Sequence, residues 1–341
     1  MCQNMAVLDP NDPQFFWMDQ LIEQDFAKVN QYITIENFEE AVQIHKGNSW
    51  VIHLRVRNNQ VEGPGCLCRD LIEYLCRIYG LEDVDFLYWN QDGAWKAPLG
   101  KVPILMGART NKIANTILFN DWCFDISNKE RGWRLEKQII DREWRKWELR
   151  EAKLFWRGSG TDTWTAGSYS VTNWAEHSRG KACYLSTLFP ELLDAAFTGF
   201  APWNCEEGAQ TALALEKIVP FSPHVSLQDH LPYKYQLQIA GVMASYPRDR
   251  WQFYSESVVF RAPQPHEMYW YGLLEPWIHY IPIESSMDDL IAKILWARAR
   301  DEKCRQIAEA GRHFAQTHFM PEHIALYCYK VLLRYAKIQK F

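Results

Sequence analysis

Residues 235–251 read YQLQIAGVMASYPRDRW, the pattern of a strand, a tight turn and a helix in succession. The apolar residues 235–240 predict the strand, and the helix is expected to begin near Arg248. Strands that lead into helices build layered α/β proteins, whose ligands bind where strands end and whose helix N-termini favour anions. In a second interpretation, equally favoured by these residues alone, Gly241 only closes a turn and Arg248 is solvated. The candidate anion-binding residues are Gly241, Val242, Ala244, Ser245 and Arg248.

Residues 153–164, KLFWRGSGTDTW, form a second strand-and-turn pattern. The short apolar strand is followed by glycines, which allow a ligand to approach the backbone, and by the hydroxyl of Ser159. Arg157 adds a planar guanidinium that fits phosphate or carboxylate. The local residues by themselves favour an ordinary solvated loop, so the anionic ligand is a hypothesis. The Ser-, Thr- and Gly-rich residues 158–172 are expected to form a mobile loop between two domains.

Helical and strand patterns alternate along most of the chain. The expected helices are residues 14–29, a helix capped by Thr34, residues 69–79, 134–152 and 181–188, a helix near Arg250, and most of the last fifty residues. The expected strands are residues 50–56, 86–89, 102–106 and 258–260, with a hairpin turn at Asn58 and Asn59. This alternation predicts two α/β domains that face each other across a cleft. The predicted boundaries are residues 1–150, 151–320 and a C-terminal helix over 321–341.

Composition limits the classes of partner. The 341 residues are 48% hydrophobic and carry a net charge of -5, so nucleic acid is not expected as the main partner. Nine scattered cysteines and an N-terminus without a basic, then apolar, segment predict a reduced protein of the cytoplasm. The sequence has no apolar run of the roughly 20 residues needed to cross a bilayer, although peripheral contact with the inner face of a membrane is compatible with it.

Few residues have the spacing of a metal site. Asp83 and Asp85 form an Asp-x-Asp pair, but they precede a strand and are interpreted as a helix end and a strand start. The Cys66–Cys68 pair lacks a second pair to complete a zinc site. Asp92 follows the strand at residues 86–89; as part of Asp-Gly it indicates a turn, while at the end of a buried strand it could act as a general base.

Five segments together resemble glycosyltransferase family 90, a family that includes Rumi-type protein O-glucosyltransferases, fungal capsule-associated proteins and bacterial lipopolysaccharide-modifying transferases. They occur in the family's order and extend over nearly the whole chain. The segments are LIEQDFAKVNQYITIENFEEA, VDFLYWNQDG, LFWRGS, RGKACYLSTLFPELLDAAF and the run from residue 233 to residue 319.

The resemblance implies a GT-B fold, with two Rossmann-like domains across a cleft, and inverting, metal-independent transfer of a hexose, expected to be glucose, from a UDP-sugar. Residues 1–150 would form the acceptor-side domain, in which Asp92 matches the proposed catalytic base. Residues 151–320 would hold the donor, with no further cofactor. The positions that match donor-binding residues are Ser159, Arg179, Arg248 and the turn from Gly241 to Ser245; Arg157 is added on physical grounds.

This sequence departs from the Rumi-type members in two ways. Residues 160–178 separate the Arg-Gly-Ser turn from Arg179, whereas the two lie close together in those proteins. Those members are also secretory, whereas a cytoplasmic location is predicted for this sequence. A lipopolysaccharide or polysaccharide precursor is therefore the expected acceptor here, and a protein hydroxyl is the alternative. A non-catalytic sugar or nucleotide binding protein and a sugar-nucleotide hydrolase are the rival functions.

Overall fold

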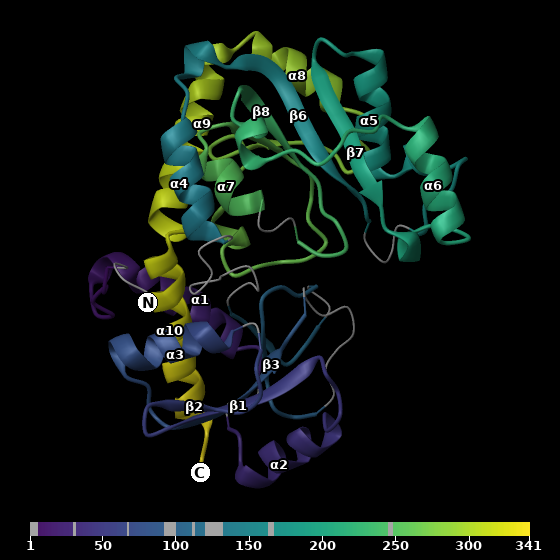
Figure 1. The fold of residues 1–341 in the computed structure, drawn as a ribbon. Coiled ribbons are helices and arrows are strands. Elements are labelled where there is room, and N and C mark those ends of the chain that lie inside the picture. Colours follow the sequence, from purple (N-terminus) through teal and green to yellow (C-terminus); the bar gives the residue numbers. More distant parts are fainter. Residues whose placement is uncertain are drawn as a thin grey trace. The chain divides into compact units, whose positions relative to one another are not determined.

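The computed structural model describes residues 6–29, 32–66, 68–91, 100–110, 113–119, 132–162, 167–244 and 248–341. The chain forms two compact units, and each combines separate stretches of sequence (Figure 1). The N-terminal unit contains residues 1–134, 266–271 and 317–341, and the C-terminal unit contains residues 135–265 and 272–316. Residues 135–150 thus belong to the C-terminal unit and the C-terminal helix belongs to the N-terminal unit, which differs from the predicted boundaries.

The N-terminal unit contains a mixed sheet in the order β2-β1-β3-β4-β5. Its strands are β1 (Val51–Arg57), β2 (Gln60–Glu62), β3 (Val84–Trp89), β4 (Ile104–Met106) and β5 (Thr116–Leu118). β1 pairs antiparallel with β2 and β3, whereas β3, β4 and β5 are parallel. The predicted hairpin turn is confirmed, because Asn58 and Asn59 have φ angles of 48° and 63°, as a two-residue turn between antiparallel strands requires.

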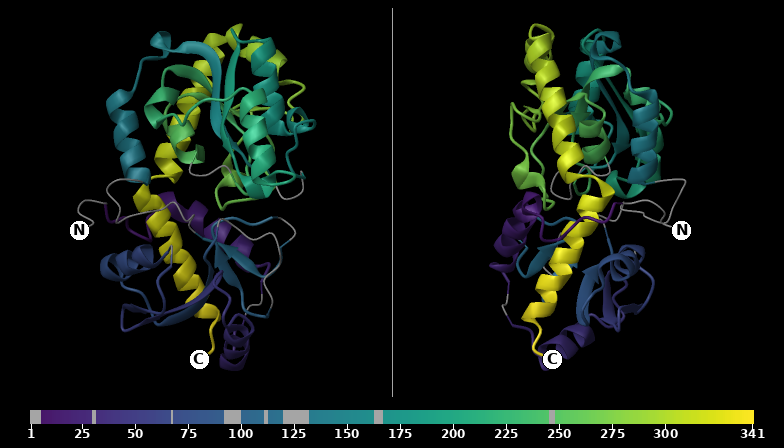
Figure 2. Two further views of the ribbon diagram at one scale, coloured as in Figure 1. Left: turned by 45° about the vertical axis from the view of Figure 1, so that its right-hand side comes forward. Right: turned by 90° about the vertical axis from the view of Figure 1, so that its left-hand side faces the viewer.

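Helices pack around this sheet. They are α1 (Phe16–Phe26), α2 (Ile35–Ile44), α3 (Arg69–Tyr79) and α10 (Pro321–Ile338). Thr34 caps α2 as predicted, since its hydroxyl accepts a hydrogen bond from the amide of Asn37 at 3.3 Å. α10 lies beside α1 and α3 (Figure 2) and is bound to α1 by the ion pair of Lys330 with Asp19 at 2.7 Å. The end of the chain therefore belongs to the core of the N-terminal unit.

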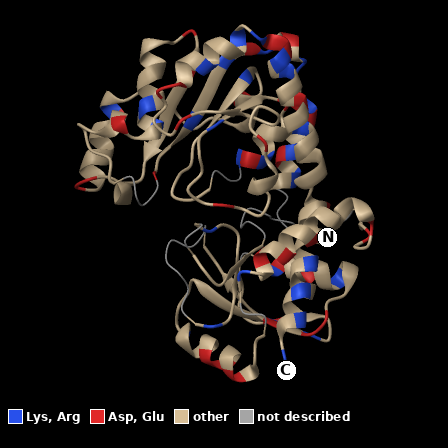
Figure 3. Ribbon diagram, turned by 180° about the vertical axis from the view of Figure 1, so that it is seen from behind, with Lys and Arg blue, Asp and Glu red and all other residues tan. Residues whose placement is uncertain are grey.

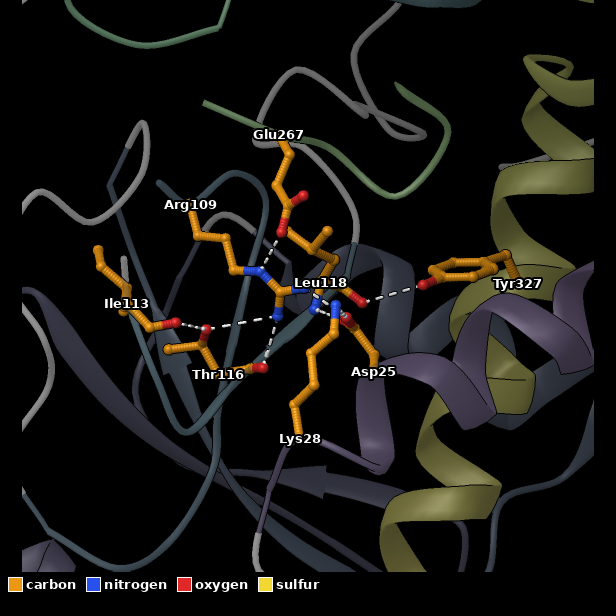
Figure 4. Close-up of polar contacts among 8 residues, drawn as sticks. All are labelled: Asp25, Lys28, Arg109, Ile113, Thr116, Leu118, Glu267 and Tyr327. Atoms are coloured by element: carbon orange, nitrogen blue, oxygen red, sulfur yellow. Dashed lines mark hydrogen bonds and ion pairs between the residues drawn. The ribbon is translucent and has the colours of Figure 1, made fainter. Parts of the chain in front are cut away.

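The buried side chain of Arg109 and its backbone join residues 266–271 to this unit (Figure 4). The guanidinium of Arg109 pairs with Asp25 and with Glu267, whose Oε1 accepts from Nε at 2.7 Å. The backbones of Arg109 and Glu267 also exchange two hydrogen bonds, at 3.1 and 2.7 Å. Asp25 further accepts from the amide of Leu118 at 2.8 Å. One buried arginine therefore joins α1, β5 and a segment about 160 residues away.

The C-terminal unit contains an entirely parallel sheet in the order β10-β9-β8-β6-β7. Its strands are β6 (Glu151–Gly160), β7 (Leu193–Phe200), β8 (Tyr233–Gln238), β9 (Val258–Arg261) and β10 (Ile281–Pro282). From β6 the chain passes to β7 on one side and then returns to β8 on the other side. The direction of winding therefore reverses between β6 and β8, which is where open parallel sheets bind ligands.

Helices cover this second sheet. They are α5 (Ser178–Leu188), α6 (Ala209–Ile218), α7 (Arg248–Tyr254), α8 (Leu290–Arg298) and α9 (Asp301–His318), preceded by α4 (Trp133–Glu143). α5 lies against β7 (Figure 1). Both signs of charge are distributed over the helices (Figure 3), in agreement with the small net charge. The two sheets and their helices confirm the predicted α/β class, and no helix in the described part of the chain has the length and apolar character needed to span a membrane.

The predicted mobile loop over residues 158–172 is wrong in part. β6 continues through Gly160, and Tyr169 is completely buried. The backbone of Tyr169 accepts from the amide of Glu206 at 2.8 Å and donates to Asn204 at 2.9 Å. Its ring packs against Phe197 and Phe200 of β7. Aromatic burial therefore fixes a segment whose composition suggested a loop.

Candidate active site

The carboxyl ends of β6 and β8 lie next to each other at the point where the winding reverses. β6 ends in Gly158, Ser159 and Gly160, and β8 is followed by the turn that begins at Ile239. Arg179, in the first turn of α5, and Arg248, the first residue of α7, both approach this edge. The two strand-and-turn patterns found in the sequence thus converge in one unit.

Arg179 is held between the two strand ends. Its Nη1 donates to the carbonyl of Ser159 at 2.7 Å and to Oγ1 of Thr161 at 2.8 Å, and its Nε donates to the carbonyl of Ala240 at 3.1 Å. Gly241 leaves room for this arrangement, since a Cβ there would lie 2.7 Å from Nη2 of Arg179. Burial lowers the pKa of Arg179. The glycine therefore leaves space for the guanidinium beside the turn.

Arg248 adds a second guanidinium to the same place. Its Nη2 donates to the carbonyl of Arg157, and its buried Nη1 has no hydrogen-bond partner among the described residues. Burial, and then the charge of Arg179, lower the pKa of Arg248 to about 10. Both guanidinium carbons lie within 6 Å of the ring of Trp156, at 5.6 and 5.9 Å. Two half-buried like charges with an unused donor are suited to binding an anion.

The other predicted residues are less closely grouped. Nη1 of Arg157 pairs with Asp194 of β7 at 2.8 Å, so this guanidinium already has a carboxylate partner. The hydroxyl of Ser159 lies 3.4 Å from that of Thr161. Val242 and Ala244 continue the turn after Gly241. Ser245 and Asp92 lie outside the described residues.

A pocket of about 560 Å³ opens at the ends of β8 and β9. Its wall includes Ile239 and Ala240, whose carbonyls also accept from Arg179. The polar residues that line it are Asp162, Asn173, Glu176, His177, Ser178, Gln264 and Ser285. None of these residues is a site residue predicted from the sequence. The available signal was the long segment before Arg179, residues 160–178, which has Asp162 near its start and His177 near its end.

In the N-terminal unit, both carboxylates of the Asp-x-Asp pair form hydrogen bonds or ion pairs with other residues of the protein. Asp83 accepts from the amide of Asn58 at 2.9 Å, and Asp85 binds His53 at 3.1 Å and also pairs with Arg57. Burial raises the pKa of Asp85, but the hydrogen bonds from His53 and Arg57 outweigh it and hold this pKa below its usual value. In the part of the chain that the structure describes, no group of three or more His, Cys, Asp or Glu could hold a metal ion.

Comparison with known proteins gives consistent matches. Protein O-glucosyltransferase 2 of Danio rerio is 33% identical over 193 residues, which cover 57% of this chain and 34% of that protein. An O-glucosyltransferase rumi homolog of Anopheles gambiae is 28% identical over 251 residues, 71% of this chain and 57% of that protein. Protein O-glucosyltransferase 1 of Homo sapiens is 24% identical over 342 residues, 94% of this chain and 80% of that protein.

These alignments differ in how much they cover. The chain spans about a third of the Danio rerio protein and a little over half of the Anopheles gambiae protein. The family model described as Glycosyl transferase family 90 matches residues 20–341, which include the strand ends that carry Arg179, Gly241 and Arg248. The family resemblance predicted from the five sequence segments is thereby confirmed: the chain belongs to glycosyl transferase family 90.

Proposed function

We propose that this chain is an inverting glycosyltransferase of the GT-B type, which moves a hexose from a UDP-sugar to a hydroxyl group. The acceptor oxygen attacks the anomeric carbon, the bond from that carbon to the diphosphate breaks, and UDP leaves. Asp92 is proposed to take the proton of the acceptor hydroxyl. Family membership and the parallel sheet of the C-terminal unit support this function.

The arginine pair is the observation that carries the proposal. Arg179 and Arg248 lie at the winding reversal of a parallel sheet, beside the first turn of α5, and Nη1 of Arg248 is buried without a partner among the described residues. A diphosphate would supply acceptor oxygens and compensate two half-buried positive charges. Because guanidiniums can neutralise a leaving diphosphate without a metal ion, we propose transfer that does not require one. Ser159 and the turn from Gly241 through Ser245 are proposed to contact the same diphosphate, and Arg157 is the least direct candidate.

The acceptor is proposed to be a protein hydroxyl. The relatives are named as protein O-glucosyltransferases, which favours this acceptor over the lipopolysaccharide or polysaccharide precursor expected from the sequence. Glucose is the proposed hexose for the same reason. The cytoplasmic location and the contact with a membrane surface stay predictions.

A donor screen tests the function. The purified protein is titrated with UDP-glucose, UDP-galactose, UDP-xylose and UDP-N-acetylglucosamine, and release of UDP is followed with and without a panel of folded and unfolded protein acceptors. We expect binding of one donor, slow hydrolysis, and faster UDP release with a protein acceptor. Binding without turnover of any donor would support the non-catalytic alternative, and hydrolysis that no acceptor accelerates would support the hydrolase.

A further inference from the structure

A buried histidine lines the pocket at the ends of β8 and β9. Nδ1 of His177 lies 2.8 Å from Oδ2 of Asp162, and both residues are 7% exposed. The ring of Tyr169 stacks on the imidazole with centroids 3.9 Å apart and an angle of 19° between the planes. The carboxylate and the ring therefore fix both the position and the orientation of the imidazole.

The carboxylate also determines which nitrogen is left for a ligand. Asp162 accepts a hydrogen bond from the N–H of Nδ1, which makes Nε2 the unprotonated nitrogen and a hydrogen-bond acceptor in the neutral ring. Among the described residues, Nε2 has no hydrogen-bond partner. The same carboxylate-to-imidazole arrangement orients histidines in many binding sites. Nε2 of His177 is thus a fixed acceptor in the wall of a pocket.

The chemistry of the pocket indicates which ligand group it suits. Asp162 and Glu176 are acidic, and no Lys or Arg lines the pocket among the residues that the structure describes. The remaining polar wall consists of amides and hydroxyls, as in Asn173 and Gln264. Such a wall would repel phosphate and bind hydroxyl groups. The pocket therefore complements the arginine pair, which suits the phosphates.

The backbone is adapted to hold this cluster. Gly180, in the first turn of α5, lies against the carbonyl of Trp174, and a Cβ at this glycine would come within 1.6 Å of that oxygen. The close approach places the turn Trp174–Glu176 directly on α5, and His177 follows as the residue before the helix. Residues 160–178 lie between the Arg-Gly-Ser turn and Arg179, where the Rumi-type members have a shorter connection. Part of this segment therefore forms a wall of the pocket.

We infer that His177, positioned by Asp162 and Tyr169, is a binding residue for the donor, and that its Nε2 accepts a hydrogen bond from a hydroxyl of the ribose or of the hexose. This inference rests on the proposed function. It assigns the pocket to the sugar part of a nucleotide sugar and the arginine pair to the diphosphate. The two sources of the hydroxyl can be separated, because UDP contains only the ribose.

The test compares three ligands, UDP, UDP-glucose and inorganic pyrophosphate, by calorimetric titration of the whole chain. In His177→Asn the shorter amide can still reach Asp162 but removes the acceptor at the position of Nε2. We expect weaker binding of UDP-glucose by about three- to tenfold, the usual effect of one lost hydrogen bond, with pyrophosphate unchanged. If the affinity for UDP falls by the same factor, the hydroxyl belongs to the ribose. If only the affinity for UDP-glucose falls, the hydroxyl belongs to the hexose.

Controls separate this effect from a change in folding. His177→Gln restores an acceptor near the position of Nε2 and should recover part of the affinity, and it serves as the second variant if His177→Asn does not fold. His224→Asn changes an exposed histidine of the same unit and should leave all three affinities unchanged. Unchanged affinity for all three ligands in both His177 variants would overturn the inference, and so would an equal loss of affinity for pyrophosphate. In either case, UDP binding by the wild type would leave the proposed function standing. A wild type that binds neither UDP nor UDP-glucose would overturn both.

Discussion

Single side chains differ in how far the sequence predicts their surroundings. Arg248 is found at a helix start as predicted, since local patterns specify this feature, whereas β8 ends at Gln238, three residues before Gly241. The pairing of Asp162 with His177 was not predicted, because the two residues lie 15 positions apart in the sequence and no local pattern indicates that they meet. The ion pair between Arg157 and Asp194 depends on strand pairing, so the sequence could offer Arg157 only as a candidate.

The proposed base can be tested without a change in the size of its side chain. Asp92→Asn keeps the turn-forming capacity but removes the proton acceptor, so the transfer rate should fall by about 10²–10⁴ while UDP binding and the melting temperature stay near wild type. Transfer, UDP affinity and melting are measured on one preparation. Retention of more than about a tenth of wild-type transfer would exclude Asp92 as the essential base.

Asp25 allows a buried and an exposed cation to be compared on one carboxylate. Arg109, at 4% side-chain exposure, pairs with Asp25 in the core, whereas Lys28 lies 3.6 Å from Asp25 with 61% exposure. Removal of one partner of a buried pair leaves an unpaired charge, so Arg109→Ala should lower the free energy of unfolding by about 3–5 kcal/mol. Lys28→Ala should cost less than about 1 kcal/mol, because solvent screens its charge. Similar losses in urea unfolding of the two variants would contradict the assignment of the ion pair.

Helices and strands with strong local patterns were predicted well, and those that depend on neighbours were not. α3 begins and ends at the predicted residues, because its apolar face repeats with helical period. β7 was missed: its sequence LDAAFTGF has little strand character, and it becomes a strand by pairing with β6. The predicted helix over residues 134–152 ends at Glu143, and the indole of Trp147 beyond it is buried with its Nε1 bonded to Asp301 at 2.9 Å.

The start of α5 can be tested through its glycine. Gly180→Ala would place a methyl group against the carbonyl of Trp174, so the turn before the helix must shift at a cost of about 1–3 kcal/mol in unfolding free energy. Gly272→Ala is the matched control, since a Cβ there meets no atom within 4 Å. Thermal unfolding of both variants measures the difference. A Gly180→Ala protein as stable as Gly272→Ala would show that α5 tolerates the methyl group and that the close approach is not required.

At the scale of the whole chain, distant stretches of sequence are brought into one unit by contacts that no local pattern contains. Residues 266–271 and α10 join the N-terminal unit although the chain between them belongs to the other unit. The sequence predicted two α/β domains, because alternating strands and helices indicate layers. It could not predict that residues 266–271 join the N-terminal unit, because the bonds of Arg109 to Glu267 link positions 158 apart.

The stability of the protein should depend on pH through a buried histidine. Burial, and then the charge of Arg248, lower the pKa of His230 from 6.5 to about 3, and its Nδ1 lies 3.1 Å from Oε1 of Gln236. Below pH 6.5 the unfolded chain binds a proton here that the folded chain excludes until about pH 3, so stability falls as the pH is lowered through this window. His230→Gln should flatten this slope by up to about 1.4 kcal/mol per pH unit in urea unfolding, and exposed His224→Gln should not. Equal slopes for wild type and His230→Gln would contradict the buried, neutral state.

Titration of the whole chain with UDP in excess chelator tests the central claim most directly, because UDP carries the diphosphate without the hexose and no acceptor or free metal ion is present. We predict saturable binding by the wild type, weakened by about 1.5–3 kcal/mol in Arg248→Ala, the scale of a hydrogen bond to a charged group, and partly recovered in Arg248→Lys. Circular dichroism of each variant checks that it is folded. Binding that appears only when manganese is added, or equal affinity in folded wild type and Arg248→Ala, would contradict a donor site in which arginines hold the diphosphate.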